Sequence, residues 1–220
     1  MRHFLVCLFI AMAISLPRAA FAEKPPLSVP KSGTLEFQVI RNGEVLGDHK
    51  FAFRHEGKRL EVDVSSDIEY RLFFIPFYKH HHRSREIWDG DRLVSMKSFT
   101  DDNGEELDLK VKAVGGKLEI DGPKGEATAP GDAAPASFWS ATALKRSQIV
   151  STLRGGVDPI EVEYIGEKTI TVKGQSRATK HYRMTGGINR DLWFDPTDNM
   201  ALVYLRFEAK DGSTVEYVLK

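Results

Sequence analysis

Cysteine is almost absent from this sequence. Cys7 is the single cysteine among 220 residues, and it lies inside an N-terminal apolar run. Disulfide bonds, a cysteine nucleophile, a cysteine-ligated zinc and an iron–sulfur cluster are therefore excluded for the rest of the chain. Nor is Cys7 placed at the end of the apolar run, where a lipoprotein needs its cysteine. The apolar core alone must stabilise the fold.

Long apolar runs are absent after residue 16. The run Phe4 to Leu16 covers 13 residues, fewer than the roughly 20 that a membrane-spanning helix needs. Pro17 ends it, and Ala20-Phe21-Ala22 has the small–x–small pattern of a signal-peptidase site. We predict a signal peptide over residues 1–22, cleaved before Glu23, and no transmembrane segment after cleavage.

The chain also lacks an excess of charge of either sign. It has 31 Lys and Arg against 31 Asp and Glu, and removal of a 22-residue leader with Arg2 and Arg18 leaves a formal charge of −2. A near-neutral protein has no general attraction for nucleic acid or for anionic membranes. We therefore expect no nucleic-acid partner.

What the sequence does contain is alternation of apolar and polar residues with a period of two. One such segment has Leu60, Val62, Val64, Ile68, Tyr70 and Leu72 on one face and Glu61, Asp63, Asp67 and Glu69 on the other. Turn signals such as Asn42-Gly43 and Asn103-Gly104 separate the segments. After an extended lead-in at 23–33, we predict one all-β, mainly antiparallel domain at 34–220. Its roughly ten to thirteen strands would form a curved meander sheet, a half-open or closed β-barrel-like structure.

One segment departs from this pattern. Residues 137–148 follow a linker at 129–136 that is rich in Pro, Ala and Gly, and Ser137 is a suitable N-cap. We predict a short helix here that covers the mouth of the curved sheet or fills its interior.

The segment FYKHHHRSREIW, residues 77–88, has three consecutive histidines in a predicted strand. Alternation places Lys79, His81, Arg83 and Arg85 on one face and Tyr78, His80, His82, Ser84, Glu86 and Trp88 on the other. The preceding strand, 59–72, has an acidic outer face, and opposite charges on paired strands contribute about 0.2–1 kcal/mol per pair. We therefore predict that the basic set faces outward and the set with His80 and His82 faces inward.

An inward face with aromatic ends and a polar middle is unusual for a sealed core, because buried polar groups need partners. It suits the wall of a cavity that holds a mostly apolar ligand. The candidate ligand-binding residues are Tyr78, His80, His82, Glu86 and Trp88. In a second reading the polar groups satisfy one another, for example His82 with Glu86.

A third reading is a metal site, since His80-x-His82 puts two imidazoles on one face. The third ligand would come from His49, His55, His181 or Glu86, but the spacing selects none of them. We therefore predict neither a metal nor another cofactor.

Three blocks carry a resemblance to a known family. They are FIPFYKHHHRSREIWDGDRLVSMKSFTDDNGE, GDAAPASFWS and RDLWFDPTDNMALVYLRFEAKDGSTVEYVL. Together they resemble the exported proteobacterial domain-of-unknown-function family 6134 and, more distantly, domain-of-unknown-function family 3108. The resemblance implies a β-rich envelope protein and supplies no activity or catalytic residue. His82, Glu86 and Trp88 fit the family's pattern, whereas His80 and His81 depart from it.

These observations leave three hypotheses. In the first, a non-enzymatic periplasmic protein binds an apolar or amphipathic envelope ligand, such as a lipid, in a β-barrel-like cavity. The second is an envelope structural or interaction module whose strand edges or 72–78 corner meet a protein partner. The third is a metal-dependent enzyme using His80, His82 and Glu86. An enzyme is disfavoured because no nucleophile, base and orienting group form a coherent set.

Overall fold

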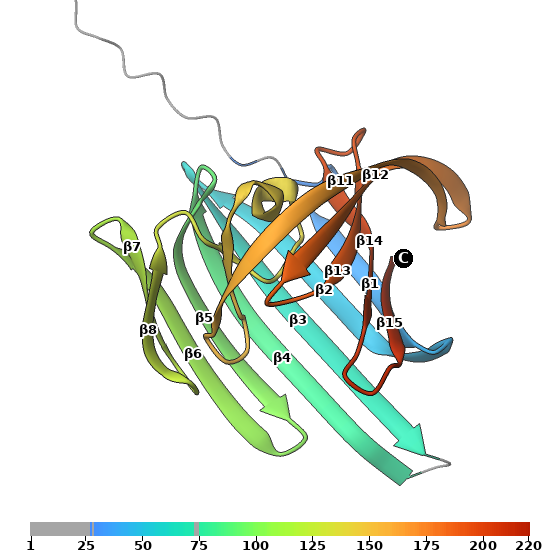
Figure 1. The fold of residues 1–220 in the computed structure, drawn as a ribbon, viewed down its shortest axis with the longest axis horizontal. Coiled ribbons are helices and arrows are strands. Elements are labelled where there is room, and N and C mark those ends of the chain that lie inside the picture. The colour runs from blue at the N-terminus through green and yellow to red at the C-terminus, as the bar shows by residue number, and fades with distance from the viewer. Residues whose placement is uncertain (1–26, 28, 73–74) are drawn as a thin grey trace, which may run out of the picture.

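A single sheet contains all fifteen strands of the described chain (Figure 1). The computed structural model describes residues 27, 29–72 and 75–220, without the side chains of 72, 75 and 76. The predicted signal peptide lies outside these residues, as do residues 23–26 and 28 of the predicted lead-in. The strands are β1 (Thr34–Arg41), β2 (Glu44–Glu56), β3 (Arg59–Leu72), β4 (Ile75–Asp89), β5 (Arg92–Asp102), β6 (Glu105–Val114), β7 (Lys117–Gly122), β8 (Gly125–Pro130), β9 (Ala134–Pro135), β10 (Gln148–Val150), β11 (Val157–Val172), β12 (Gln175–Gly186), β13 (Arg190–Asp195), β14 (Ala201–Glu208) and β15 (Thr214–Leu219).

The sheet is a meander closed upon itself only in part. Its order is β8-β7-β6-β5-β4-β3-β2-β1-β15-β14-β13-β12-β11-β10-β9, with antiparallel pairing throughout except between β9 and β10. The sheet curves so that β8 approaches β10 and β11, but no ladder joins the two edges of the described sheet. This confirms the predicted all-β, curved meander sheet, and of the two predicted forms, half-open and closed, the structure has the half-open one. The strands β9 and β10 are too short to show alternation in the sequence, which explains why fewer strands were expected.

Period-2 alternation sets which residues face the interior. In β3, Leu60, Val62 and Val64 are buried on the inner face. The predicted turn at Asn42-Gly43 joins β1 to β2 with positive φ at both residues, 48° and 84°, as a tight hairpin requires. Local sequence therefore specifies both the strands and the hairpins of this half of the sheet.

The predicted helix is much shorter than the sequence suggested. Instead of residues 137–148, only a 3-10 helix forms, η1 (Ala141–Lys145), with Ser140 rather than Ser137 as its N-cap. At the start of the predicted helix, the carbonyl of Trp139 accepts from the backbone N–H of Leu202 and Ser140 forms a bridge with Ala201, and at its end Gln148 begins β10, which pairs with β9 and β11. Pairing with the sheet satisfies these backbone groups and outweighs a weak local helix propensity.

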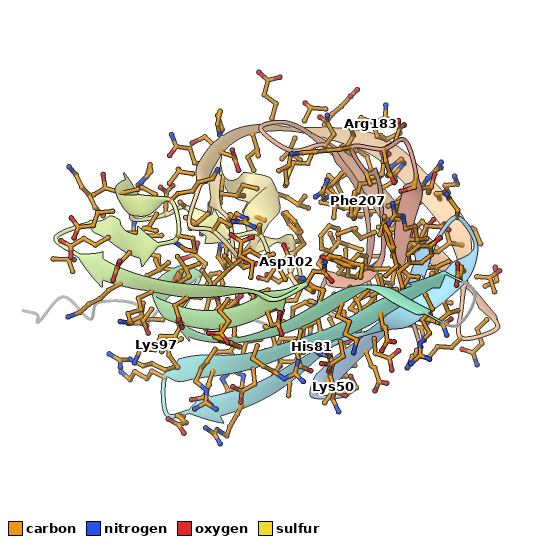
Figure 2. The ribbon with its side chains drawn as sticks, turned by 90° about the horizontal axis from the view of Figure 1, so that it is seen from below. Lys50, His81, Lys97, Asp102, Arg183 and Phe207 are labelled. Carbon is orange, nitrogen blue, oxygen red and sulfur yellow. The ribbon has the colours of Figure 1, made fainter. Side chains whose placement is uncertain are left out.

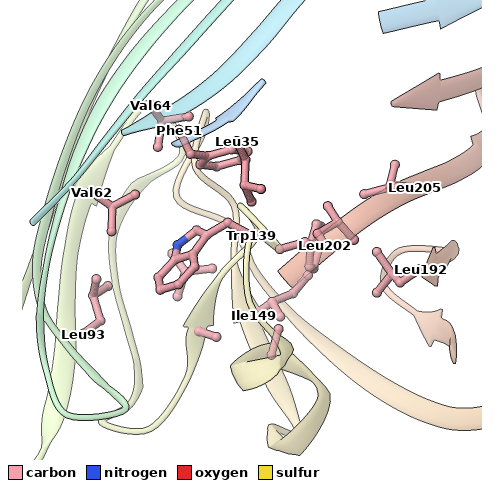
Figure 3. Close-up of a cluster of buried hydrophobic side chains, with 14 of the residues drawn as sticks. Leu35, Phe51, Val62, Val64, Leu93, Trp139, Ile149, Leu192, Leu202 and Leu205 are labelled. Carbon is pink, nitrogen blue, oxygen red and sulfur yellow. The ribbon is translucent and has the colours of Figure 1, made fainter. Parts of the chain in front are cut away.

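The core lies between the two walls of the curved sheet. Figure 3 shows Trp139 between Val62 and Leu93 on one side and Leu202 on the other. The Trp139 ring is 5.0 Å from the ring of Phe53 and 5.7 Å from that of Trp88. The segment before η1 thus places the Trp139 ring in the core. The segment predicted to cover the mouth of the sheet or to fill its interior therefore fills part of the interior.

The outer face of β3 and β4 is a charge ladder. Arg83 binds both carboxylate oxygens of Asp67, at 2.8 and 2.9 Å, and Arg85 donates to Asp63 at 2.7 Å. His81 lies 2.9 Å from Asp67 on the same face. Figure 2 shows His81 turned away from the interior, in contrast to Asp102 and Phe207. The predicted assignment of the two faces of β4 is therefore confirmed.

Candidate functional site

A cavity of about 260 Å³ lies between the two walls of the sheet. One side is formed by β1 to β4 and the other by β13 to β15, with the segments 136–138 and 151–153 between them. Much of its wall is apolar, including Phe37, Phe51, Phe138, Ile149, Leu205 and Phe207. The interior is therefore not completely filled by side chains.

A row of polar side chains crosses the inner face beside this cavity. Register pairs Thr100 with His82, His82 with Ser66, and Ser66 with His49 on four successive strands. His82 is hydrogen-bonded through Nδ1 to the Thr100 hydroxyl at 2.7 Å. The hydroxyls of Ser66 and Ser84 and Nδ1 of His49 are buried without a hydrogen-bond partner among the described residues. Since buried polar atoms are nearly always bonded, this row is suited to receiving polar groups of a ligand.

Burial keeps the two histidines of this row uncharged. Desolvation, followed by the influence of His82 and His80, lowers the pKa of His49 to about 3. Desolvation is also the main cause that lowers the pKa of His82 to about 4, with contributions from His80 and Arg83. The His49 ring lies edge-on to Phe51 at 4.6 Å and to Tyr217 at 5.5 Å. At neutral pH both imidazoles can accept or donate a hydrogen bond without carrying a charge.

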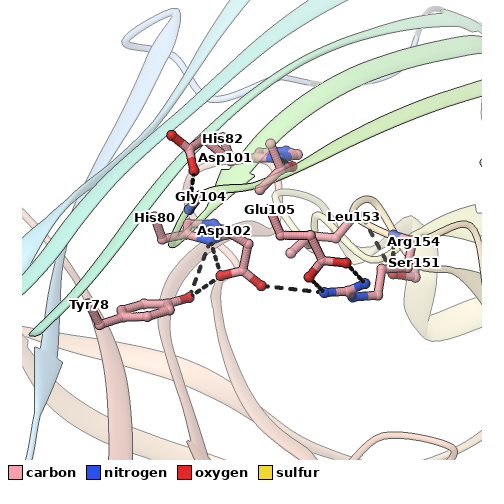
Figure 4. Close-up of polar contacts among 11 residues, drawn as sticks. Tyr78, His80, His82, Asp101, Asp102, Gly104, Glu105, Ser151, Leu153 and Arg154 are labelled. Atoms are coloured by element: carbon pink, nitrogen blue, oxygen red, sulfur yellow. Dashed lines mark hydrogen bonds and ion pairs between the residues drawn. The ribbon is translucent and has the colours of Figure 1, made fainter. Parts of the chain in front are cut away.

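Beside the cavity, His80 belongs to a polar cluster with Tyr78 and Asp102 (Figure 4). Tyr78 donates to Asp102 at 2.6 Å, and His80 Nδ1 lies 3.4 Å from the same carboxylate oxygen. Burial raises the pKa of Asp102, but these hydrogen bonds outweigh it and the net pKa is lowered. Arg154 lies 3.6 Å from Asp102 and binds Glu105. The cluster fixes the orientation of the His80 ring.

Glu86 belongs to a sealed part of the core rather than to the cavity wall. Its Oε2 accepts hydrogen bonds from the indole of Trp88 at 2.9 Å and from the indole of Trp139 at 3.0 Å, while Oε1 has no hydrogen-bond partner among the described residues. Burial raises its pKa, although the hydrogen bonds oppose that shift. The suggested pairing of His82 with Glu86 is therefore wrong, since His82 bonds Thr100 instead.

The five predicted site residues thus divide into two groups. His80 and His82 line the cavity, whereas Tyr78, Glu86 and Trp88 do not. Figure 2 places Asp102, the partner of His80, on the inner side of the sheet.

Sequence reasoning missed several residues that do line the cavity. Among them are His49, which the sequence pointed to only as a candidate metal ligand, and Ser66, Arg190 and Tyr217. Strand parity carries a signal for each of the first three. His49 has the parity of Phe51, Ser66 interrupts an apolar face, and Arg190 has the parity of Leu192 and Phe194. A polar residue in phase with buried apolar neighbours is the pattern to search for.

Neither His181 nor His55 completes a metal site. His181 faces away from the cavity, where its ring stacks on Trp193 at 4.1 Å and Nε2 lies 2.9 Å from Asp191. His55 is exposed near the end of β2. Among the residues that the structure describes, no three His, Cys, Asp or Glu side chains form a group able to hold a metal ion.

The fold and the cavity define a class: a curved, half-open antiparallel β-sheet protein with a largely apolar internal cavity. The family model of the domain of unknown function DUF6134 matches residues 37–220, and the chain belongs to that family. No curated protein matches the chain. The described residues contain no helix long and apolar enough to span a membrane. The more distant resemblance to domain-of-unknown-function family 3108 stays a prediction.

Proposed function

We propose that this is a periplasmic, non-enzymatic binding protein that holds an apolar or amphipathic envelope ligand between the two walls of its sheet. The observation that carries the proposal is the polar row inside an apolar cavity. His49, Ser66 and Ser84 contribute buried polar atoms that no described residue satisfies. A cavity with a few unsatisfied polar atoms in an apolar wall is typical of small-molecule sites.

The volume of the cavity limits the size of the ligand that it can enclose. Sites that surround drug-sized molecules measure about 300–1,000 Å³, and this cavity measures about 260 Å³. It is therefore suited to a small ligand, or to one chain of a larger amphipathic molecule.

Native mass spectrometry of the protein taken from a bacterial periplasm tests the proposal. The full chain, expressed with its leader, should yield a protein that begins at Glu23 and carries a non-covalent adduct. Ser66→Leu should fill the cavity and reduce the adduct at least about tenfold, because Ser66 lies on its wall. Overpacking of this kind destabilises proteins by about 1–3 kcal/mol, so circular dichroism must show that the variant is folded.

Ser65→Leu is the matched control. Ser65 is the adjacent residue of β3, and it lies on the outer face opposite Arg83. The control should retain the adduct. A wild-type protein without any adduct, or equal adducts in both variants, would contradict binding in this cavity.

The alternative of an interaction module rests on a different surface. Phe77 is 66% exposed at the β3–β4 end of the sheet. Crosslinking that captures a stoichiometric protein partner, lost in Phe77→Ser but not in Ser66→Leu, would favour that alternative over a carrier.

A further inference from the structure

Arg190 places a cation in the wall of the cavity. It opens β13, where it pairs with Met184 of β12, and alternation puts it on the inner face with Leu192 and Phe194. Its guanidinium lies 3.8 Å from the centre of the Phe207 ring. Nη1 donates to the carbonyl of Asn189 at 2.7 Å. No carboxylate of the described chain forms an ion pair with it, so most of its five N–H donors have no described partner.

The surroundings of Arg190 supply no compensating negative charge. It is the only Lys or Arg among the described residues that line the cavity. Asp158, the one carboxylate of that lining, forms no ion pair with it in the described part of the chain. Desolvation lowers the pKa of Arg190, and the nearby Tyr217 partly opposes this shift. A partly buried cation without a counter-ion is costly unless a ligand supplies the opposite charge.

Tyr217 connects this cation to the polar row. Its ring contacts both His49, at 5.5 Å, and Phe207, at 6.5 Å. Tyr217 lines the same cavity, and burial raises its pKa, so the hydroxyl remains a hydrogen-bond donor at neutral pH. Phe207, which stacks with Arg190, points to the interior in Figure 2.

We propose that Arg190 and Tyr217 bind the acidic head of a singly charged amphipathic carboxylate, whose apolar part occupies the rest of the cavity. This inference rests on the proposed function and narrows its ligand class. A planar guanidinium matches a carboxylate with two parallel hydrogen bonds. One cation balances one negative charge, whereas a doubly charged phosphate monoester would leave a buried charge uncompensated. His49 and His82 add neutral hydrogen-bonding groups rather than further charge.

Isothermal titration calorimetry with four eight-carbon probes tests the inference. The probes are sodium octanoate, 1-octanol, octyltrimethylammonium chloride and octyl phosphate, each used below its micellar concentration. Octanoate should bind the wild type at least about tenfold more tightly than octanol or octyl phosphate, with no measurable binding of the ammonium probe.

Substitutions of Arg190 test whether this residue causes the preference for octanoate over octanol. Arg190→Gln should remove the preference for octanoate over octanol while octanol still binds. Arg190→Lys keeps the charge but loses the paired donors, so its preference should be intermediate. Arg206→Gln is the matched control, because Arg206 is an exposed cation of the adjacent strand β14 and should leave all four affinities unchanged. Thermal unfolding of each variant confirms that it is folded.

The outcomes separate the two proposals. Equal binding of octanoate and octanol by the wild type, or a preference retained in folded Arg190→Gln, would overturn the role of Arg190 while leaving cavity binding intact. Tighter binding of octyl phosphate would overturn the choice of a singly charged carboxylate. Failure of every probe, together with no adduct in native mass spectrometry, would overturn cavity binding itself.

Discussion

The inner face of β4 has two parts, one around Glu86 and one around His82, in which the buried polar groups have different surroundings. Around Glu86, the indole N–H groups of Trp88 and Trp139 both donate to Oε2 of the buried carboxylate, while Oε1 has no hydrogen-bond partner among the described residues. Around His82, the neighbouring Ser66 and Ser84 hydroxyls are buried as deeply but have no partner in the described chain. One end of the strand therefore holds a carboxylate that is anchored by two indole hydrogen bonds, and the other end lies among hydroxyls that have no partner among the described residues. Ser66, His82 and Ser84 line the cavity and Glu86 does not, so it is the cavity, rather than burial or an unsatisfied polar atom alone, that identifies the candidate site.

The largest expected loss of stability comes from removing the Glu86 carboxylate, which anchors the two indoles. Glu86→Leu removes the acceptor of two buried indole N–H groups, and each unsatisfied donor costs about 1–3 kcal/mol. Relief of the buried carboxylate offsets part of this loss, since burial raises the pKa of Glu86. We expect the free energy of unfolding to fall by roughly 3 kcal/mol, measured by urea denaturation at pH 7.

Glu86→Gln is the control for this prediction. Both indoles bond the same carboxylate oxygen, and a glutamine side chain offers one carbonyl oxygen that can accept both. Its stability should therefore lie much closer to that of the wild type. Equal stability of Glu86→Leu and Glu86→Gln would show that the indole hydrogen bonds contribute little.

A smaller effect should come from His49, in the polar row beside the cavity. It should make the stability of the protein depend on pH. His49 has a folded-state pKa of about 3, below its unfolded value of about 6.5, so the folded state binds fewer protons. The stability linked to His49 is complete above pH 6.5 and is lost as the pH falls toward 3. Between pH 7.5 and pH 5 the wild type should lose about 2 kcal/mol more than His49→Phe, which has no titrating ring at this position.

The comparison with His49→Phe matters because other groups titrate nearby. The lowered pKa of His82, like that of His49, makes the protein less stable as the pH falls. The raised pKa of Glu86 has the opposite effect and favours folding at low pH. His55→Phe, at an exposed position of the same strand, should keep the wild-type pH dependence. Parallel stability curves for wild type and His49→Phe would show that the buried ring does not determine this pH dependence.

Much of the fold could be predicted because its causes are local. Alternation along β3 and β4 fixes their faces, and the pairing of Arg83 with Asp67 lies on two strands joined directly in sequence. The register is then set by a hydrophobic face and by complementary charge, both visible in the sequence.

The candidate site could be predicted only in part because the curvature of the sheet assembles it. His80 and His82 are on the strand that the sequence singled out, but Arg190 and Tyr217 reach the cavity from the opposite wall. Glu86 does not line the cavity as predicted, and one of its two indole partners, Trp139, is 53 residues away in the chain. No local pattern contains that contact. Other long-range pairings, of Ser140 with Ala201 and of β10 with β11, flank η1 where the sequence predicted a longer helix.

The smallest effects should distinguish two serines of similar burial. Ser98 donates to the carbonyl of Thr152 at 2.6 Å, whereas the Ser66 hydroxyl has no partner among the described residues. Ser98→Ala should therefore lower the free energy of unfolding by about 1 kcal/mol, and Ser66→Ala in ligand-free protein should change it by less than about 0.5 kcal/mol. Urea denaturation of both variants measures the difference. A loss at Ser66 as large as that at Ser98 would mean that water already satisfies the hydroxyl, and the contrast between the two parts of the inner face would disappear.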